Sequence, residues 1–370
     1  MAIKELAHSV QQHLKSVTGH LFKRSHIYEL LAASFGFKSY AALCNDHVLT
    51  QRAEATVLSA QHHQFLLKRV SELGYKPLVA VPASSAFSSY IEEQHINVEA
   101  VDDIITEPNY GNHFYDELEG LEESEYGDNG YPSMLLEGLK TKARKGDHRA
   151  HYALAIIYRD SDGDYDQEIG GEYWYKQQQQ GRILSGVEKE WADGHANQLE
   201  RAEKYTYHLR KASKLGNTPA LVDLAEYLND SSYLDEAKNR GTTDNPMRAA
   251  EVADSLGRNE HVKYWLTIAA ESGNTDAMRR LIDDFDHDDI ERSWMWLYLA
   301  KILGTDLTKS NLNAFHEGGQ YANQHYDDDI GGPLYIAGDE GARLKPLDED
   351  GKHAAKERAN TLFQKLQQSM

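Results

Sequence analysis

The chain has 370 residues, of which 40% are apolar and 10% aromatic, and its formal net charge is −20. This apolar content is enough to bury a core, so a wholly disordered chain is excluded. No apolar run approaches the roughly 20 residues that span a bilayer, and the early charge pair Lys4-Glu5 interrupts the stretch that a signal peptide needs. The single cysteine, Cys44, excludes an internal disulfide framework and a zinc site of several thiolates. We therefore expect a cytoplasmic protein that does not bind a membrane.

Charge divides the chain into three parts. Residues 1–76 contain nine Lys/Arg and five Asp/Glu, whereas residues 77–139 contain fourteen Asp/Glu and no Lys or Arg. The remainder is acidic again, with a net charge of about −10. A change of sign on this scale bears on partners and solubility rather than on fold. We expect a basic helical head over 1–76, an acidic connector over 77–132 and a region of helical repeats over 133–370.

Two helices are predicted in the head, over residues 3–17 and 51–73, from the helical spacing of their apolar side chains. Between them, Ser25 is positioned to cap one helix, Gly36 to end it and Ser39 to cap the next. The spacing of Ala32 and Gly36 is typical of the turn in a helix-turn-helix. Residues 20–45 also resemble a short helical module at the front of assorted bacterial proteins.

The head therefore has two interpretations. It contacts DNA through basic side chains near this turn, or it is a packed helical cap with a solvated basic edge. The side chains of the DNA hypothesis are Lys23, Arg24, His26 and Lys38. The acidic body argues against DNA, because it would repel the phosphate backbone.

The acidic connector combines carboxylates with aromatic residues such as Tyr110, Phe114 and Tyr115. It is interpreted as a linker between domains. Two alternatives remain open: the segment binds a basic peptide or the chain's own basic head, or it mimics a nucleic-acid backbone.

The repeats appear when the chain is aligned on five glycines, Gly146, Gly181, Gly216, Gly273 and Gly304. Alanine recurs four residues after three of them, at Ala150, Ala220 and Ala277, and leucine recurs eight residues after the same three, at Leu154, Leu224 and Leu281. Side chains four apart share one face of a helix. Gly followed by Asn or Asp ends one helix in a left-handed residue and provides the N-cap of the next. The pattern predicts stacked helical hairpins, since one hairpin cannot bury its own apolar stripe.

The stretches 146–158 and 264–277 resemble Sel1-like repeats, which are relatives of the tetratricopeptide repeat. The resemblance covers about 135–310 and is degenerate after Gly181 and Gly304, where Lys189 and Thr308 replace the expected residues. It implies an all-α fold, a right-handed solenoid with a concave binding face, and a role as adaptor or scaffold without catalysis. Beyond the repeats, 327–333 is predicted as a loop and 353–368 as a closing helix.

Two acidic clusters are candidate metal sites. Asp160, Asp162, Asp164 and Asp166 have the spacing that starts a calcium loop, but the later glycine and glutamate are missing. The run Asp283–Asp289 includes Phe285 of the apolar stripe, so it is interpreted as a solvated helix end. We expect no metal, no cofactor and no catalytic residue, and we interpret Cys44 as a small buried side chain.

The binding face is assigned to aromatic anchors and nearby cations in the repeats. The assigned residues are Tyr173, Tyr175, Lys176, Tyr207, Arg210, Lys211, Tyr264 and Tyr298. Because the body is acidic, a protein partner with a basic segment is expected. The first alternative is a regulator whose head binds nucleic acid, and the second is an acidic nucleic-acid mimic. The oligomeric state cannot be derived from the sequence.

Overall fold

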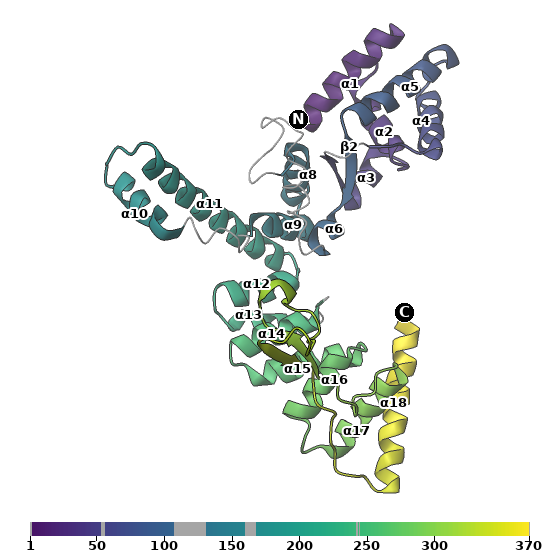
Figure 1. The fold of residues 1–370 in the computed structure, drawn as a ribbon. Coiled ribbons are helices and arrows are strands. Elements are labelled where there is room, and N and C mark those ends of the chain that lie inside the picture. The colour runs from purple at the N-terminus through teal and green to yellow at the C-terminus, as the bar shows by residue number, and fades with distance from the viewer. Residues whose placement is uncertain are drawn as a thin grey trace. The chain divides into compact units, whose positions relative to one another are not determined.

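The computed structural model describes residues 2–52, 56–106, 131–159, 168–241, 243 and 245–369. The chain divides into two compact units, unit 1 over Met1–Ala220 and unit 2 over Leu221–Met370 (Figure 1). The described residues are mostly helical, as expected, but each unit also contains a two-stranded antiparallel sheet that the all-α prediction missed.

Unit 1 begins with a helical head built around one small sheet. Its elements are α1 (Ile3–Thr18), α2 (Arg24–Ser34), α3 (Tyr40–Asp46), β1 (His47–Gln51), α4 (Ala60–Glu72), α5 (Pro77–Glu93), β2 (Ile96–Ala100) and α6 (Val101–Thr106). β1 pairs with β2 in the register His47↔Ala100 to Gln51↔Ile96. Helix α4 therefore starts nine residues later than the predicted 51, because Gln51 belongs to a strand.

Local signals in the head were predicted with mixed success. Ser39 caps α3 as expected, since its hydroxyl accepts a hydrogen bond from the Ala42 N–H at 3.1 Å. Gly36 follows α2 in a left-handed conformation with φ +81°. Ser25, however, is not a cap: α2 begins at Arg24 with Lys23 in the capping position.

The connector prediction is wrong for residues 77–106. Ala80, Ala83, Phe87 and Ile91 of α5 are buried in the same apolar cluster as α1, α2 and α4. Met134, from the first helix of the repeat region, belongs to this cluster too. The change of charge at residue 77 therefore changes the surface charge within one folded region and does not mark a domain boundary. Residues 107–130, with most of the connector's acids and aromatics, lie outside the described residues.

The rest of unit 1 is formed by α8 (Ser133–Arg144), α9 (His148–Tyr158), α10 (Glu168–Gln179) and α11 (Val187–Lys214). Between α8 and α9 the chain turns at Gly146, whose φ is +87°, and Asp147 caps α9 by accepting hydrogen bonds from the Arg149 and Ala150 N–H groups. Gly216 and Gly273 are also left-handed, and the Asn that follows each one accepts a capping hydrogen bond from the next helix. The predicted glycine–cap pattern is confirmed at these three turns.

Helix α11 replaces the pair of helices expected between Gly181 and Gly216. It contains 28 residues and is about 42 Å long. The one candidate breaker inside it is Gly194, which weakens a helix by about 1 kcal/mol relative to alanine but does not end it. Figure 1 shows α10 beside the N-terminal part of α11, and α9 packs against the C-terminal part.

Unit 2 is formed by short helices followed by a hairpin and a long terminal helix. Its elements are α12 (Pro219–Tyr227), which crosses the boundary between the units, α13 (Ser232–Arg240), α14 (Pro246–Ser255), α15 (Asn259–Glu271), α16 (Thr275–Arg280), the π-helical turn η5 (Leu281–Phe285), α17 (Ile290–Ile302), β3 (Asn313–His316), the 3₁₀ turn η6 (Gly319–Tyr321), β4 (Leu334–Ala337) and α18 (Glu349–Ser369).

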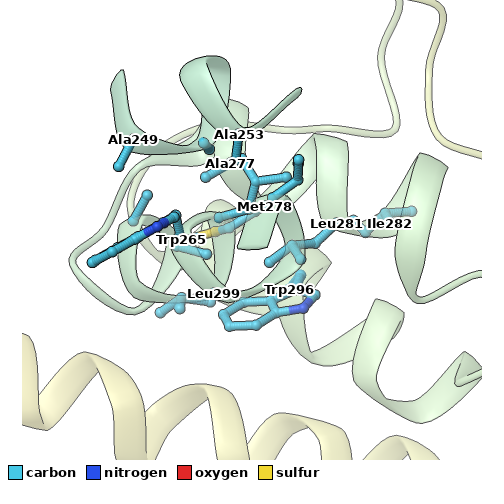
Figure 2. Packing of buried hydrophobic residues seen from close by; sticks show 14 of the residues in the cluster. Ala249, Ala253, Trp265, Ala277, Met278, Leu281, Ile282, Trp296 and Leu299 are labelled. Atoms are coloured by element: carbon cyan, nitrogen blue, oxygen red, sulfur yellow. The ribbon is translucent and has the colours of Figure 1, made fainter. Parts of the chain in front are cut away.

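The core of unit 2 combines two buried indoles with small side chains (Figure 2). Trp265 of α15 and Trp296 of α17 are each almost fully buried. Around them, Ala249, Ala253 and Ala277 let α14, α15 and α16 approach closely, and Ala277 is one of the recurring alanines of the sequence pattern. After Gly304 no further repeat follows. α18 packs against α17 instead, as the predicted closing helix.

Among the described helices, none has both the length and the apolar character required to cross a bilayer.

Candidate functional site

The predicted anchors fall on three parts of the chain. Tyr173, Tyr175 and Lys176 lie on α10, whereas Tyr207, Arg210 and Lys211 lie near the C-terminal end of α11. Tyr264 and Tyr298 belong to unit 2. Tyr175 contacts His195 at 5.4 Å between ring centroids, and His195 is about 18 Å from Tyr207 along the axis of α11.

The site with the most developed geometry is the α9–α11 junction, which we define as His151 and Tyr158 of α9 with Lys204, Tyr207, His208 and Lys211 of α11. Asp147 fixes the start of α9, and the buried Ala150, Leu154 and Tyr158 follow at intervals of four residues. On α11, Leu209 and Ala212 are buried, so the neighbouring Tyr207, Arg210 and Lys211 point outward.

Aromatic rings of the junction form a continuous cluster. Tyr158 stacks on His208 with centroids 5.8 Å apart, and Tyr207 meets His208 edge-on at 5.1 Å. His151 also contacts the Tyr207 ring, at 6.4 Å. The Tyr207 side chain remains 54% exposed. A rigid, half-exposed tyrosine on a packed base is the kind of group that anchors a partner.

Lysines surround these rings. Lys204 Nζ lies 5.1 Å from the centroid of Tyr158, and Lys211 Nζ lies 5.6 Å from the centroid of Tyr207. Both are within the range of cation–π attraction. Lys204 also pairs with Glu200 at 2.9 Å, and Arg210 is exposed beside Lys211. The junction is therefore locally basic on a chain whose total charge is strongly negative.

The two histidines of the junction are hydrogen-bonded to each other. Their Nδ1 atoms are 2.9 Å apart, so one must donate and the other must accept. Burial, together with the nearby charges of His151, Lys140 and Lys204, lowers the pKa of His208 to about 4. Burial also lowers the pKa of His151, with Lys211 adding to the effect, while a hydrogen bond to the Ala143 backbone and the Asp147 charge oppose it. Both rings are therefore neutral at pH 7.

No family model, curated protein or solved structure matches this chain.

What the junction does must therefore be argued from its chemistry. It combines a shared imidazole proton, an exposed tyrosine and several cations. Within the described residues, no group of three or more His, Cys, Asp or Glu side chains is arranged to hold a metal ion. The arrangement suits the binding of an acidic or aromatic group.

The predicted anchors on α10 are arranged differently. Tyr173 is 55% exposed and meets Trp174 edge-on at 5.0 Å. The ammonium of Lys176 pairs with Glu172 at 2.5 Å, so its charge is already compensated. Trp174 is covered by the Arg182 guanidinium, 4.7 Å from its centroid. This helix offers one exposed tyrosine but little uncompensated charge.

Tyr264 and Tyr298 are engaged within unit 2. The Tyr264 hydroxyl donates to the Gly241 carbonyl at 3.4 Å, and Lys238 lies over its ring at 4.9 Å. Tyr298 lies against Trp294, with the Lys356 ammonium of α18 5.3 Å from its ring centroid. Both side chains are half-buried. The hairpin pattern predicted that they would be open, but side chains of other helices cover both rings.

The DNA hypothesis gains little from the geometry of the head. Lys23, Arg24 and Lys38 are exposed, and His26 Nδ1 is hydrogen-bonded to the Tyr75 hydroxyl at 2.9 Å. A recognition helix must present side chains to base edges. The helix in that position, α3, has seven residues and no Lys or Arg, and Asp46 at its end pairs with Arg149.

The two acidic clusters have different outcomes. Asp160–Asp166 lies outside the described residues. In the second cluster, Asp286 is buried and pairs with Lys263 at 2.9 Å and with Arg292 at 3.1 Å, while Trp296 Nε1 donates to it at 3.1 Å. The carboxylate that the sequence placed at a solvated helix end therefore belongs to the core of unit 2 and is neutralised by protein cations.

Cys44 lies at a cavity of about 230 Å³ in unit 1, between α1, α3, β1 and α8. The thiol is half-buried and lies beside Tyr40, whose pKa is raised by burial and, to a smaller degree, by Cys44. The walls are largely apolar, and the ammonium of Lys142 is held by the Asn45 carbonyl at 2.5 Å and by Asp147 at 3.6 Å. A cation compensated in this way gives the cavity no clear ligand chemistry.

Sequence reasoning missed His151, Tyr158, Lys204 and His208. Of the side chains in the aromatic cluster, only Tyr207 is among the anchors assigned from the sequence. Only the packing of α9 on α11 brings the two histidines together, and no spacing in the sequence encodes that contact.

Proposed function

We propose that the protein is a non-catalytic adaptor, built from Sel1-like helical hairpins, that captures a segment of a partner protein at the α9–α11 junction. Tyr207 is the anchor, and Lys211 and Arg210 fix a polar group beside it. The observation that carries the proposal is the 54% exposed Tyr207 ring, held against His208 with the Lys211 ammonium 5.6 Å from its centroid.

Local charge revises the expected partner at this site. The chain as a whole is acidic, and its total charge predicts a basic partner segment. The cations nearest to Tyr207 favour the opposite, namely a segment in which an acidic residue neighbours an aromatic or apolar one. Buried anchors contribute most of the affinity in such contacts, and exposed charges mainly raise the association rate.

The test is affinity capture from the host lysate with the full chain, followed by mass spectrometry and nucleic-acid staining. The double variant Tyr207→Ala/Lys211→Ala removes the anchor and its cation. Tyr173→Ala/Lys176→Ala is the matched control, because it removes the same residue types from α10 and Tyr173 has nearly the same exposure, 55%. Truncating a true anchor typically costs about 2 kcal/mol or more.

We expect the first variant to lose a protein that the wild type and the control retain, with unchanged helical circular dichroism. Equal capture by all three proteins would refute the assignment of the junction. Loss in the control alone would move the site to α10. Retention of nucleic acid in place of protein would favour the regulator hypothesis.

A further inference from the structure

The hairpin in unit 2 has one edge that is covered and one that is not. β3 pairs with β4 in the register Asn313↔Ala337 to His316↔Leu334. On the other side of β3, the His316 N–H donates to the Gln324 carbonyl at 3.0 Å, and the Tyr326 N–H donates to the Ala314 carbonyl at 2.8 Å. β3 is thus the central strand, and β4 is the outer one.

The direction of each backbone group on β4 follows from the ladder. The Glu317 N–H donates to the Pro333 carbonyl at 2.9 Å, and the Asn311 N–H donates to the Asp339 carbonyl at 3.1 Å. In an antiparallel pair the hydrogen-bonded positions alternate. Pro333, Tyr335, Ala337 and Asp339 therefore face β3, and the N–H and C=O groups of Leu334 and Ile336 point to the open edge. No described residue provides a backbone partner for either of them.

The side chains of this edge are also exposed. Ile336 is 64% exposed and Leu334 41%, and the two share one face of the strand because they are two residues apart. The strand Leu334–Ala337 contains no charge, no proline and no glycine. Natural edge strands usually carry such features to prevent pairing with another chain. An uncharged, apolar, open edge is typical of a strand that accepts a partner strand.

The surroundings of the edge decide the charge of that partner. Residues 310–342 contain six Asp/Glu and no Lys or Arg. Four of these acids are exposed: Glu317, whose N–H bonds to Pro333 at the start of β4, and Asp327, Asp328 and Asp329 in the loop that precedes β4 in the chain. Asp339, which follows the strand, is 3.6 Å from Arg279 and is thereby partly compensated. Two copies of this edge would repel each other, whereas a basic segment would be attracted.

We propose that the outer edge of β4 binds an extended segment of a partner protein in which apolar residues alternate with Lys or Arg. The incoming strand hydrogen-bonds to the N–H and C=O groups of Leu334 and Ile336. Its apolar side chains cover those of the same two residues, and its cations are attracted by the net negative charge of residues 310–342. This second docking site lies in unit 2 and is chemically distinct from the α9–α11 junction, so either proposal stands if the other fails.

The test uses the full chain and a synthetic peptide of about eight residues in which valine and lysine alternate, a length that suits one strand. Binding is measured by fluorescence anisotropy at low and at physiological salt. A peptide of alternating valine and glutamate tests the charge. A third peptide keeps valine and lysine but is N-methylated at two adjacent central amides, which removes a donor from each edge of the strand, obstructs pairing at both edges and leaves the charge unchanged.

The decisive variant is Ile336→Pro, which removes an N–H that points away from β3 and so spares the ladder. Ile183→Pro is the matched control, because Ile183 is 95% exposed in a loop of unit 1. Circular dichroism and melting temperature report whether both variants remain folded. A second variant, Asp328→Asn/Asp329→Asn, lowers the charge without touching the strand.

We expect saturable binding of the valine–lysine peptide, weakened about tenfold by Ile336→Pro and by N-methylation, and unchanged by Ile183→Pro. The aspartate variant should weaken binding mainly at low salt. Equal binding of the N-methylated peptide, or equal affinity in Ile336→Pro, would overturn the proposal, since charge alone would then explain the contact. A dimer of the free protein that dissociates in Ile336→Pro would also overturn it, in favour of a second copy of this chain.

Discussion

His151 and His208 face each other where α9 packs on α11, with their Nδ1 atoms 2.9 Å apart. A hydrogen bond between these two nitrogens requires that at least one of them is deprotonated. The contact is compatible with neutral pH and is lost when both rings are charged.

Acid should therefore destabilise unit 1 through this pair. The folded-state pKa of His208 is about 4, below the value near 6.5 of an unfolded histidine. The unfolded chain thus binds more protons as the pH falls, and stability present above about pH 6.5 decreases toward pH 4. After allowance for solvent screening of the partly exposed ring, the loss at pH 5 is roughly 1 kcal/mol.

Urea unfolding near pH 7.5 and near pH 5 checks this prediction. His208→Gln keeps a hydrogen-bonding side chain but does not titrate, so its stability should change less between the two pH values than that of the wild type. His8→Gln, at an exposed position of α1, should behave like the wild type. The prediction is wrong if His208→Gln and the wild type lose the same free energy.

Neutralising Asp286 should strongly destabilise unit 2. This carboxylate is 1% exposed and compensates the charges of Lys263 and Arg292. Asp286→Asn leaves those cations against a neutral amide, and breaking a buried ion pair costs about 3–5 kcal/mol. Asp288→Asn is the control, because its side chain is 98% exposed and a surface change costs within about 0.5 kcal/mol. Tryptophan fluorescence during urea unfolding measures both, and similar midpoints would contradict the prediction.

The packing of α8 on β1 should be sensitive to a single methyl group. A Cβ at Gly138 would lie 3.1 Å from Val48 Cβ and Cγ1, and Val48 is buried. Alanine gains about 1 kcal/mol of helix propensity, but overpacking costs about 1–3 kcal/mol, so we expect Gly138→Ala to be net destabilising. Val48→Ala removes Cγ1, one of the two atoms that this methyl group would meet, and keeps Cβ. A double-mutant cycle should therefore show a favourable coupling of about 1 kcal/mol, and purely additive effects would refute the contact.

Features that depend on a few neighbouring residues were predictable from the sequence. The glycine and cap of each turn act through their own backbone, so Gly146-Asp147 and Gly273-Asn274 were identified correctly. The burial of Leu154 and Leu281 followed from helical spacing for the same reason.

Features that depend on distant contacts were not predictable. Strands β1 and β2 pair although α4 and α5 lie between them in the chain. Neither strand sequence alternates clearly between apolar and polar residues. Two helices were expected where α11 forms one continuous helix. This stretch contains no strong helix breaker, and an alignment on glycines does not detect that absence. The contact between His151 and His208 and the open edge of β4 both arise from tertiary packing, and the second lies just beyond the predicted loop 327–333, where no element was predicted.

The uncovered edge of β4 also limits how concentrated this protein can become. An unpaired strand edge is a template for aggregation unless charge or shape blocks it. Here the charges lie in the loop that precedes the strand, on Asp327, Asp328 and Asp329, rather than within it. Repulsion between two such loops would oppose pairing of the edges, and high salt or acid would weaken that repulsion. We therefore expect self-association of this protein to increase at high concentration, high salt or low pH.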